Sequence, residues 1–338
     1  MSRKIMEITT LYGIQTPCRS DGYRQKKGKT PFEERGGAAM TAEPVPHWPG
    51  RMIGPVHVRS TPEGPAEQAV FVHGLAGSAT NWTDLMDELK DTVTGHAIDL
   101  PGAGFSPAPA DGDYSVAAHS NVVIGLLEHT GPAHLFGNSM GGAISVRVAA
   151  QRPDLVRSLT LISPALPDLL PRYGPIRVAA AAIPKLGEWV ADRLRLVPVE
   201  QRITASMAMV YADMRAVHPV RLRDAIEEQR RRDELPYAGQ AIVGSARGIV
   251  SEYFRRGEEN LWRQAAKVKA PTLIIHGRHD RLVRPAMADK AYRTFRQVRL
   301  VLLPTAGHVA MMEMPRVVAA EARRLISETR LGNAPLPS

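Results

Sequence analysis

The stretch HLFGNSMGGAIS, residues 134–145, decides how this sequence is read. Its apolar beginning is typical of a buried strand, and its end follows the pattern of a helix. Between the two stands Ser139, with Gly137 and Gly141 two residues away on either side. Such a turn can hold a serine hydroxyl clear of a sheet, whereas an ordinary strand-to-helix turn would use Ser139 as a helix N-cap. The pattern alone leaves both interpretations open.

Short apolar runs alternate with helical patterns on both sides of this stretch. We expect a strand or hairpin over 51–60, buried strands over 68–74, 94–102, 133–137, 158–164, 271–277 and 299–307, and helices over 81–90, 115–129, 139–153, 285–295 and 316–330. Asn81 or Thr83 is the expected N-cap of the first helix. Alternation of this kind predicts an α/β fold with a mostly parallel sheet covered by helices on both faces.

The alternation stops after Pro164 and resumes near residue 269. The residues between hold helical patterns, such as 176–195 and 221–235, but no convincing buried strand. We therefore expect a core made of 49–165 and 269–330, interrupted by a helical cap or lid over 166–268. An insertion of this kind is expected over the carboxyl edge of the sheet, where ligands bind in open α/β folds.

The two ends of the chain are expected to lie outside the core. Residues 1–48 are basic and rich in glycine and proline without a sustained period, which predicts a disordered tail, and 331–338 are expected to be flexible. Met40 offers a plausible alternative translation start. The tail holds Cys18, the one cysteine of the chain, so no internal disulfide or cysteine metal site is possible.

Composition narrows the class of protein. With 44% hydrophobic and 23% charged residues, the 338-residue chain is typical of a soluble globular protein. No stretch has the length of a signal peptide's apolar region or of a transmembrane helix, so we expect a cytoplasmic location. The net charge of +9 comes from scattered arginines, which favours a solvated surface over a nucleic-acid partner. Membrane contact by the arginine-rich insertion and the oligomeric state are left open.

Four segments stand at the carboxyl ends of expected strands, in a fixed order along the chain. They are HGLAGSATNW (73–82), GNSMG (137–141), HGRHDRLV (276–283) and AGHVAMME (306–313). Together they resemble the α/β-hydrolase family, in which serine, acid and histidine follow one another in this order. The resemblance covers about residues 50 to 328 and implies an α/β-hydrolase fold with a helical cap.

The resemblance implies a catalytic triad. Ser139 would be the nucleophile, since a serine hydroxyl needs a strained turn and a base to attack a carbonyl. His308 would be the general base that takes the serine proton and returns it to the leaving group. Asp280 would orient His308 and stabilise its charged form. Asp168 is the competing acid, because it follows the preceding expected strand and some family members carry the acid there.

The same resemblance places the oxyanion donors. The backbone amide of Met140 directly follows the nucleophile, and that of Leu75 lies in the segment after the first buried strand. We expect His73 to brace that segment, and the loop DLPGAGFS (99–106) to have a structural role. No metal-binding or phosphate-binding motif is present, so we expect neither a metal nor a cofactor.

Several activities are compatible with these residues. Dehalogenases and epoxide hydrolases of this fold carry aspartate at the position of Ser139, which argues against both. The favoured substrate is a small-molecule ester with an apolar acyl group, bound near the methionine-rich stretches 203–214 and 307–315. The motif Gly-Asn-Ser-Met-Gly-Gly also occurs in carbon–carbon hydrolases of the meta-cleavage type, although those enzymes usually carry tryptophan where this chain has Val309. A perhydrolase or haloperoxidase is a weaker third possibility, and a non-catalytic ligand-binding protein is a fourth.

Overall fold

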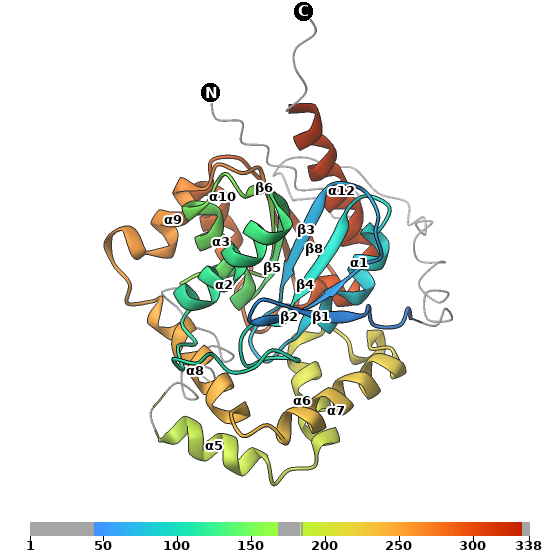
Figure 1. Cartoon of the computed structure of the whole chain (residues 1–338), viewed down its shortest axis with the longest axis vertical. Helices are drawn as coiled ribbons and strands as arrows, with labels where there is room; N and C mark the ends of the chain where they lie inside the picture. The colour runs from blue at the N-terminus through green and yellow to red at the C-terminus, as the bar shows by residue number, and fades with distance from the viewer. Residues whose placement is uncertain (1–43, 168–182, 184, 333–338) are drawn as a thin grey trace, which may run out of the picture.

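A computed structural model describes residues 44–167, 183 and 185–332 of the chain. Its centre is an eight-stranded sheet in the order β1-β2-β4-β3-β5-β6-β7-β8 (Figure 1). The strands are β1 (Gly50–Ile53), β2 (Val56–Ser60), β3 (Gln68–Val72), β4 (Thr94–Ile98), β5 (Ala133–Asn138), β6 (Val156–Ile162), β7 (Thr272–Gly277) and β8 (Val298–Leu303). The hairpin β1–β2 pairs antiparallel with β4, and the other six strands are parallel. The expected α/β class and sheet are confirmed.

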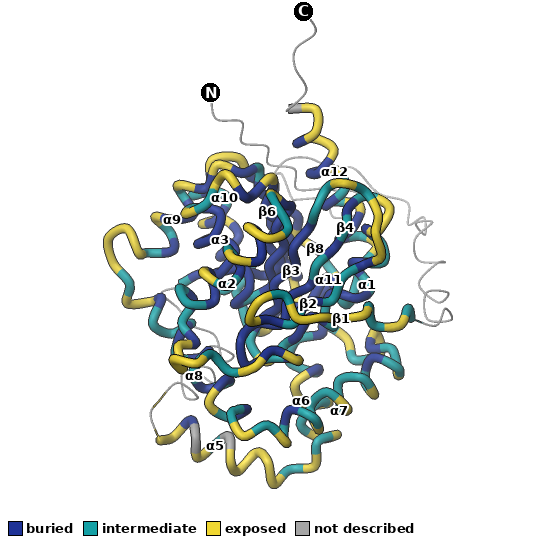
Figure 2. Tube along the Cα trace, in the orientation of Figure 1, coloured by how far each residue is buried: buried dark blue, intermediate teal, exposed yellow. Residues whose placement is uncertain are grey.

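Helices cover both faces of the sheet because successive strand residues point to opposite sides. On β3, for example, Val70 and Val72 join one apolar cluster, and Ala69 and Phe71 join the other. One face carries α2 (Val116–Thr130), α3 (Met140–Gln151), α9 (Leu261–Lys267) and α10 (Ala286–Thr294), and the other carries α1 (Thr83–Leu89), α11 (Ala310–Glu313) and α12 (Pro315–Gly332). Figure 2 shows the sheet as the most deeply buried part of the fold. The central strands are therefore rigid supports for the loops at their ends.

The described residues between β6 and β7, hereafter the insertion, contain helices and no strand. Besides α9 they form α5 (Leu186–Leu194), α6 (Val199–Val210), η3 (Met214–Ala216), α7 (Pro219–Asp233), α8 (Ala238–Ser251) and η4 (Gly257–Glu259). In Figure 1, α5 to α8 lie together at one end of the sheet. No helix among the described residues is long and apolar enough to cross a membrane.

The first helix after β3 begins and is capped differently from the expectation. The first helical turn after β3 is a 3₁₀ helix, η2 (Ala79–Trp82), and it is capped by Ser78 rather than by either expected residue. The Ser78 hydroxyl accepts from the Thr80 amide, while the Asn81 side chain accepts from the Ser78 amide in a capping box. The expected caps, Asn81 and Thr83, lie three and five residues after Ser78, because the apolar run of the helix begins after its cap.

The predicted tail also ends earlier than residue 48. The Trp48 indole donates to the carbonyl of Thr83 at 3.2 Å, and the His47 ring lies 2.7 Å from the Thr83 hydroxyl. Arg221 of the insertion donates to the Val45 carbonyl at 2.7 Å. Residues 44–48 therefore pack on α1 and α7, while Cys18 and Met40 lie outside the described residues. At the other end, α12 continues through Gly332.

Candidate active site

Ser139 lies on a sharp turn between β5 and α3. Its φ of 52° and ψ of −117° are unusual for a residue with a side chain, a conformation that costs about 1–3 kcal/mol. Its amide donates to the carbonyl of Ile162 at 3.1 Å, which holds the turn against β6. Ser139 is the N-cap residue of α3, yet its hydroxyl makes no capping hydrogen bond. The ordinary capping role therefore does not account for this serine.

The two flanking glycines are required for space rather than for their own backbone angles. A Cβ on Gly137 would lie 2.4 Å from the carbonyl oxygen of Gly141. A Cβ on Gly141 would lie 2.1 Å from the carbonyl oxygen of Val72 in β3. No side chain fits at such distances, so the glycines let α3 begin directly against the sheet while the positive φ falls on Ser139 itself.

His308 and Asp280 meet at the carboxyl ends of β7 and β8. The Nδ1–H of His308 donates to Oδ2 of Asp280 at 2.9 Å, and both side chains are buried. The other carboxylate oxygen, Oδ1, accepts from the amides of Leu282 at 2.8 Å and Val283 at 2.9 Å. Because the ionised carboxylate is an acceptor only, it keeps the proton of a neutral His308 on Nδ1 and leaves Nε2 able to accept one.

The surroundings of Asp280 keep it ionised. Burial by itself would raise the pKa of Asp280, but the facing ring of His308, with a smaller effect of His276, lowers it to about 2. Nε2 of the buried His276 ring lies 3.6 Å from Oδ2 of Asp280 and 3.2 Å from the carbonyl oxygen of Val283. The competing acid, Asp168, lies outside the described residues.

The loop that carries His308 is anchored from both sides. The Asn138 carboxamide donates to the carbonyls of Ile162 and His308, each at 3.0 Å, and so ties this loop to the residue before the turn serine. On the side of the insertion, the His308 amide donates to the carbonyl of Val210 at 2.7 Å. Position and orientation of the ring are thereby fixed by backbone contacts as well as by Asp280.

Leu75 and Met140 stand next to Ser139. Met140 opens α3, and Leu75 lies in the turn 74–77, where a Cβ on Gly74 would lie 3.1 Å from the Cβ of Ser139. Among the described residues neither amide has an acceptor in the protein. The buried ring of His73 braces this turn: its Nδ1–H donates to the carbonyl of Gly74 at 2.7 Å, and its Nε2 accepts from the Leu100 amide at 3.0 Å.

The loop 99–106 is held by Asp99. Its buried carboxylate accepts from the amides of Ala79 at 2.7 Å and Phe105 at 3.0 Å, and from the His57 ring at 2.7 Å. These contacts lower the pKa of Asp99 against the effect of its burial. The carboxylate holds two backbone amides and one ring, which agrees with the structural role expected for this loop.

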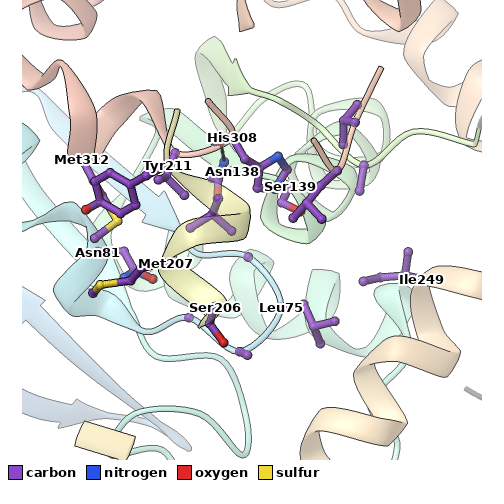
Figure 3. A pocket seen from close by; sticks show the side chains of 18 of the residues that line it. Leu75, Asn81, Asn138, Ser139, Ser206, Met207, Tyr211, Ile249, His308 and Met312 are labelled. Atoms are coloured by element: carbon purple, nitrogen blue, oxygen red, sulfur yellow. Dashed lines mark hydrogen bonds between the residues drawn. The ribbon is translucent and has the colours of Figure 1, made fainter. Parts of the chain in front are cut away.

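A cavity of about 450 Å³ connects these groups to the insertion. Ser139, His308 and Leu75 line one part of it, and the remainder is mainly apolar (Figure 3). The apolar lining from the insertion includes Leu166, Ile203, Met207, Val210, Ile249, Val250 and Phe254. Of the two methionine-rich stretches, Met207 and Met312 reach the cavity, whereas Met311 is buried in the core. The described residues hold no cluster of side chains that could bind a metal ion.

The comparison with protein families agrees with this geometry. A family model described as alpha/beta hydrolase fold matches residues 70–315, well over half of the chain. The chain belongs to the α/β hydrolase family. The hydrolase is 27% identical to lipase 3 of Moraxella sp. over 254 residues, which are 73% of each chain. It is also 27% identical to the dihydrolipoyllysine-residue acetyltransferase component of the acetoin cleaving system of Cupriavidus necator, over 74% of this chain but only 61% of that protein, so it spans less than two thirds of that relative.

Solved structures share the fold of this hydrolase. The meta-cleavage product hydrolase of Pseudomonas fluorescens IP01 matches with a TM-score of 0.65 at 18% identity, over 81% of this chain and 95% of that chain. A likeness at this identity shows the architecture alone. The family model confirms the expected resemblance and makes the chain a member of a hydrolase family. A lipase is among its sequence relatives, and the likeness to the meta-cleavage hydrolase is one of architecture.

Two residues that support the site of this hydrolase were missed at the level of sequence. Asn138 was noted only as part of a motif, yet it connects the serine turn to the histidine loop. Glu313 accepts from the amides of Gly307 at 2.8 Å and Ala212 at 2.7 Å, and its burial raises its pKa despite these contacts. It joins the histidine loop to the insertion. Glu313 lies five residues after His308 in the sequence. This spacing alone does not show that its side chain reaches back to the Gly307 amide.

Proposed function

We propose that this α/β hydrolase is a cofactor-independent serine hydrolase that cleaves an ester of an apolar acyl group through an acyl-Ser139 intermediate. The observation that carries the proposal is that His308, held by Asp280 at 2.9 Å, lines the same mainly apolar cavity as Ser139, which lies on a strained turn. A similarity to a lipase of Moraxella sp. supports ester chemistry.

The first half of the reaction forms the acyl-enzyme. Nε2 of His308 takes the proton of the Ser139 hydroxyl as its Oγ attacks the ester carbonyl carbon. The carbonyl oxygen gains negative charge, which the amides of Leu75 and Met140 and the N-terminal end of α3 stabilise. The tetrahedral intermediate collapses when the bond to the alkoxy oxygen breaks, and His308 gives its proton to the departing alcohol. Asp280 stabilises the imidazolium that exists between these steps.

The second half of the reaction repeats the same steps with water. His308 removes a proton from a water molecule, whose oxygen attacks the acyl carbon. The same two amides hold the new oxyanion, and its collapse breaks the bond to Oγ of Ser139. His308 returns the proton to Oγ, and the carboxylic acid leaves. Every proton transfer uses one ring nitrogen, which Asp280 keeps available.

The lining of the cavity supports an apolar acyl group. The side chains of Ile203, Met207, Val210 and Ile249 form a wall without charge, and burial of each methylene of a substrate against it contributes about 0.8 kcal/mol. The flexible thioethers of Met207 and Met312 can adapt to chains of different shape. We therefore expect kcat/KM to rise with acyl length until the cavity is filled.

Turnover of p-nitrophenyl esters from acetate to decanoate tests this proposal. We expect hydrolysis with an optimum beyond acetate, and a loss of at least about 10⁴-fold in Ser139→Ala. A matched control is Ser206→Ala, which removes the hydroxyl of another cavity-lining serine, on α6, and should alter KM more than kcat. Hydrolysis that survives in Ser139→Ala would contradict the proposal.

A second candidate is a carbon–carbon hydrolase of the meta-cleavage type. The stretch Gly-Asn-Ser-Met-Gly-Gly at 137–142 favours it, while HGLAGS at 73–78 and Val309 favour esters. A vinylogous 1,5-diketone tested beside the esters separates the two, because a carbon–carbon hydrolase would turn over the diketone faster. A protein that binds ligands without catalysis would hydrolyse neither and would not react with a fluorophosphonate.

A further inference from the structure

A cation from the insertion lies behind the turn 74–77. Arg232, near the end of α7, is 7% exposed, and its Nη1 donates to the carbonyl of Ala76 at 2.9 Å. Its Nη2 lies 3.5 Å from the carbonyl of Gly77 and donates to Oε1 of Glu228 at 3.2 Å. Arg232 does not line the large cavity, so its contact with the turn is made from the opposite side.

Glu228 extends this contact along the same segment. Its second oxygen, Oε2, accepts from the hydroxyls of Ser78 at 2.9 Å and Thr80 at 3.0 Å. Because Glu228 and Arg232 are one helical turn apart, they form a paired unit on one face of α7. This unit holds the segment from Ala76 to Thr80 to the insertion by charge-assisted hydrogen bonds, which are stronger than neutral ones.

The turn needs such support because its backbone is unfavourable. Ala76 has a φ of 58°, a left-handed conformation in which glycine is preferred and alanine is disfavoured. The Gly77 amide donates to the carbonyl of Gly74 at 3.1 Å and closes the turn around Leu75. A turn whose third residue has a positive φ depends on external contacts when that residue is not glycine.

Packing behind the turn is incomplete. A second cavity of about 20 Å³, room for about one water molecule, lies against it. It is lined by Arg232, by the buried His119 and Ser245, and by residues 74–77 themselves. Side-chain packing alone therefore leaves the turn room to move, and the guanidinium of Arg232 is the contact that fixes the Ala76 carbonyl.

We propose that Arg232, paired with Glu228, is a positioning residue that fixes the turn 74–77 so that the Leu75 amide points at the oxyanion formed on Ser139. The inference rests on the proposed function, since it assigns Arg232 to the same acyl transfer. Arg232 touches neither substrate nor Ser139 and acts through the turn. Its effect falls on the step in which charge develops on the carbonyl oxygen, and the apolar cavity that binds the acyl chain is unaffected.

The test compares Arg232→Gln with wild type on a p-nitrophenyl ester. We expect kcat to fall about 10- to 100-fold, less than or similar to the loss of a full oxyanion donor, with KM changed less than threefold. Arg232→Lys retains one donor and should recover part of the loss. The matched control is Arg230→Gln, since Arg230 lies on the same helix, pairs with Glu200 and makes no contact with the turn.

Two readouts separate positioning from a general loss of structure. The endpoint of fluorophosphonate labelling counts competent Ser139, and kcat is expressed per labelled site. An alkyl boronic acid, which forms a tetrahedral adduct with serine, should bind Arg232→Gln more weakly by the same factor by which kcat falls. If Arg232→Gln does not fold, Arg232→Lys and Glu228→Gln are compared in the same way, and each should lower kcat per site.

Two different failures remain distinguishable. Wild type that is neither labelled by the fluorophosphonate nor active on esters overturns the proposed function, and this inference with it. Active and labelled wild type, with kcat per site in Arg232→Gln within twofold of wild type, overturns this inference alone. The inference is also overturned if Arg232→Gln raises KM and leaves kcat unchanged. It is overturned as well if Arg230→Gln lowers kcat by the same factor as Arg232→Gln.

Discussion

Asp280 determines which ring nitrogen of His308 carries a proton. Its Oδ2 takes the Nδ1–H of His308, and its Oδ1 is occupied by the amides of Leu282 and Val283. Both oxygens are thus committed, and the carboxylate cannot rotate without losing backbone contacts. The orientation of the imidazole follows from these contacts, and so does the readiness of Nε2 to accept a proton.

The first prediction at this scale concerns the identity of the acid. Asp280→Asn should lower kcat/KM for esters roughly 10⁴-fold, because an amide can favour the wrong tautomer of His308. Asp168→Asn should retain most activity. Asp289→Asn, an exposed change on α10, is the structural control. The reverse order of the Asp280 and Asp168 effects, measured by steady-state kinetics, would reassign the acid.

The second prediction concerns stability against pH. The pKa of Asp280 in the folded chain is about 2, below its ordinary value of 3.8, so folding stabilises its ionised form. This contribution, on the order of 2 kcal/mol, is fully present above about pH 4 and is lost as the pH falls towards 2. In urea unfolding, the stability difference between wild type and Asp280→Asn should be constant from pH 7 to about pH 4 and shrink below it. A difference that shrinks already between pH 7 and pH 5 would contradict the assigned pKa.

At the scale of elements, the junction of β5 and α3 depends on close approach of backbones. The first turn of α3 lies so near to β3 that Gly141 has no room for a side chain. The strain of the positive φ at Ser139 is supported by this packing and by the bond from its amide to Ile162. The junction of β5 and α3 therefore holds Ser139 rigidly and is not a flexible loop.

Two glycine substitutions test whether the junction of β5 and α3 depends on this close packing. Gly141→Ala should lower the free energy of unfolding by about 3 kcal/mol or more, because its Cβ would meet the carbonyl of Val72 at 2.1 Å. Gly125→Ala, on the exposed side of α2 with no atom near its Cβ, should raise it by about 0.5–1 kcal/mol. Chemical denaturation of both variants measures these changes. Equal stability of the two variants would show that the junction has space to spare.

At the scale of the whole molecule, the insertion contacts the segments that carry Leu75, Ser139 and His308. Val210 holds the His308 amide, Arg232 holds the turn of Leu75, and Glu252 at the end of α8 pairs with Arg147 of α3 at 3.0 Å. Arg147 and Glu252 are both almost fully buried. Insertion and core therefore stabilise each other through polar contacts that need correct docking, which predicts that loss of one contact weakens the whole fold.

The buried pair provides the prediction at this scale. Glu252→Gln should destabilise the protein by about 3 kcal/mol, because it leaves the buried charge of Arg147 with only the more exposed Glu259. A double variant, Arg147→Met with Glu252→Leu, should recover much of this loss, since no unpaired charge remains. Glu128→Gln, which removes an exposed partner of Arg152, serves as the control and should leave the unfolding midpoint unchanged. A similar midpoint for Glu252→Gln and Glu128→Gln would contradict the account.

The sequence predicted those parts of the molecule that have a local signature. The sheet follows from apolar runs such as 68–72 and 272–277, and the segments that carry Ser139, Asp280 and His308 follow from residue types and their order at strand ends. Contacts between a side chain and a distant backbone leave no periodic pattern and no fixed residue spacing in the sequence. The bonds from Asn138 to His308 and from Arg232 to Ala76 span 170 and 156 residues and could be found only in the folded chain. The capping role of Ser78 was missed because the apolar run begins after it.

The central claim is that Ser139 is the nucleophile of a hydrolase, and peptide mass spectrometry after fluorophosphonate labelling tests it most directly. We predict one adduct per chain on the peptide that contains Ser139. The adduct should be absent in Ser139→Ala, and its formation should be much slower in His308→Ala. Pretreatment with a slowly hydrolysed ester of an apolar acid should protect the same residue. An adduct on another serine, or equal labelling of Ser139→Ala, would contradict the account.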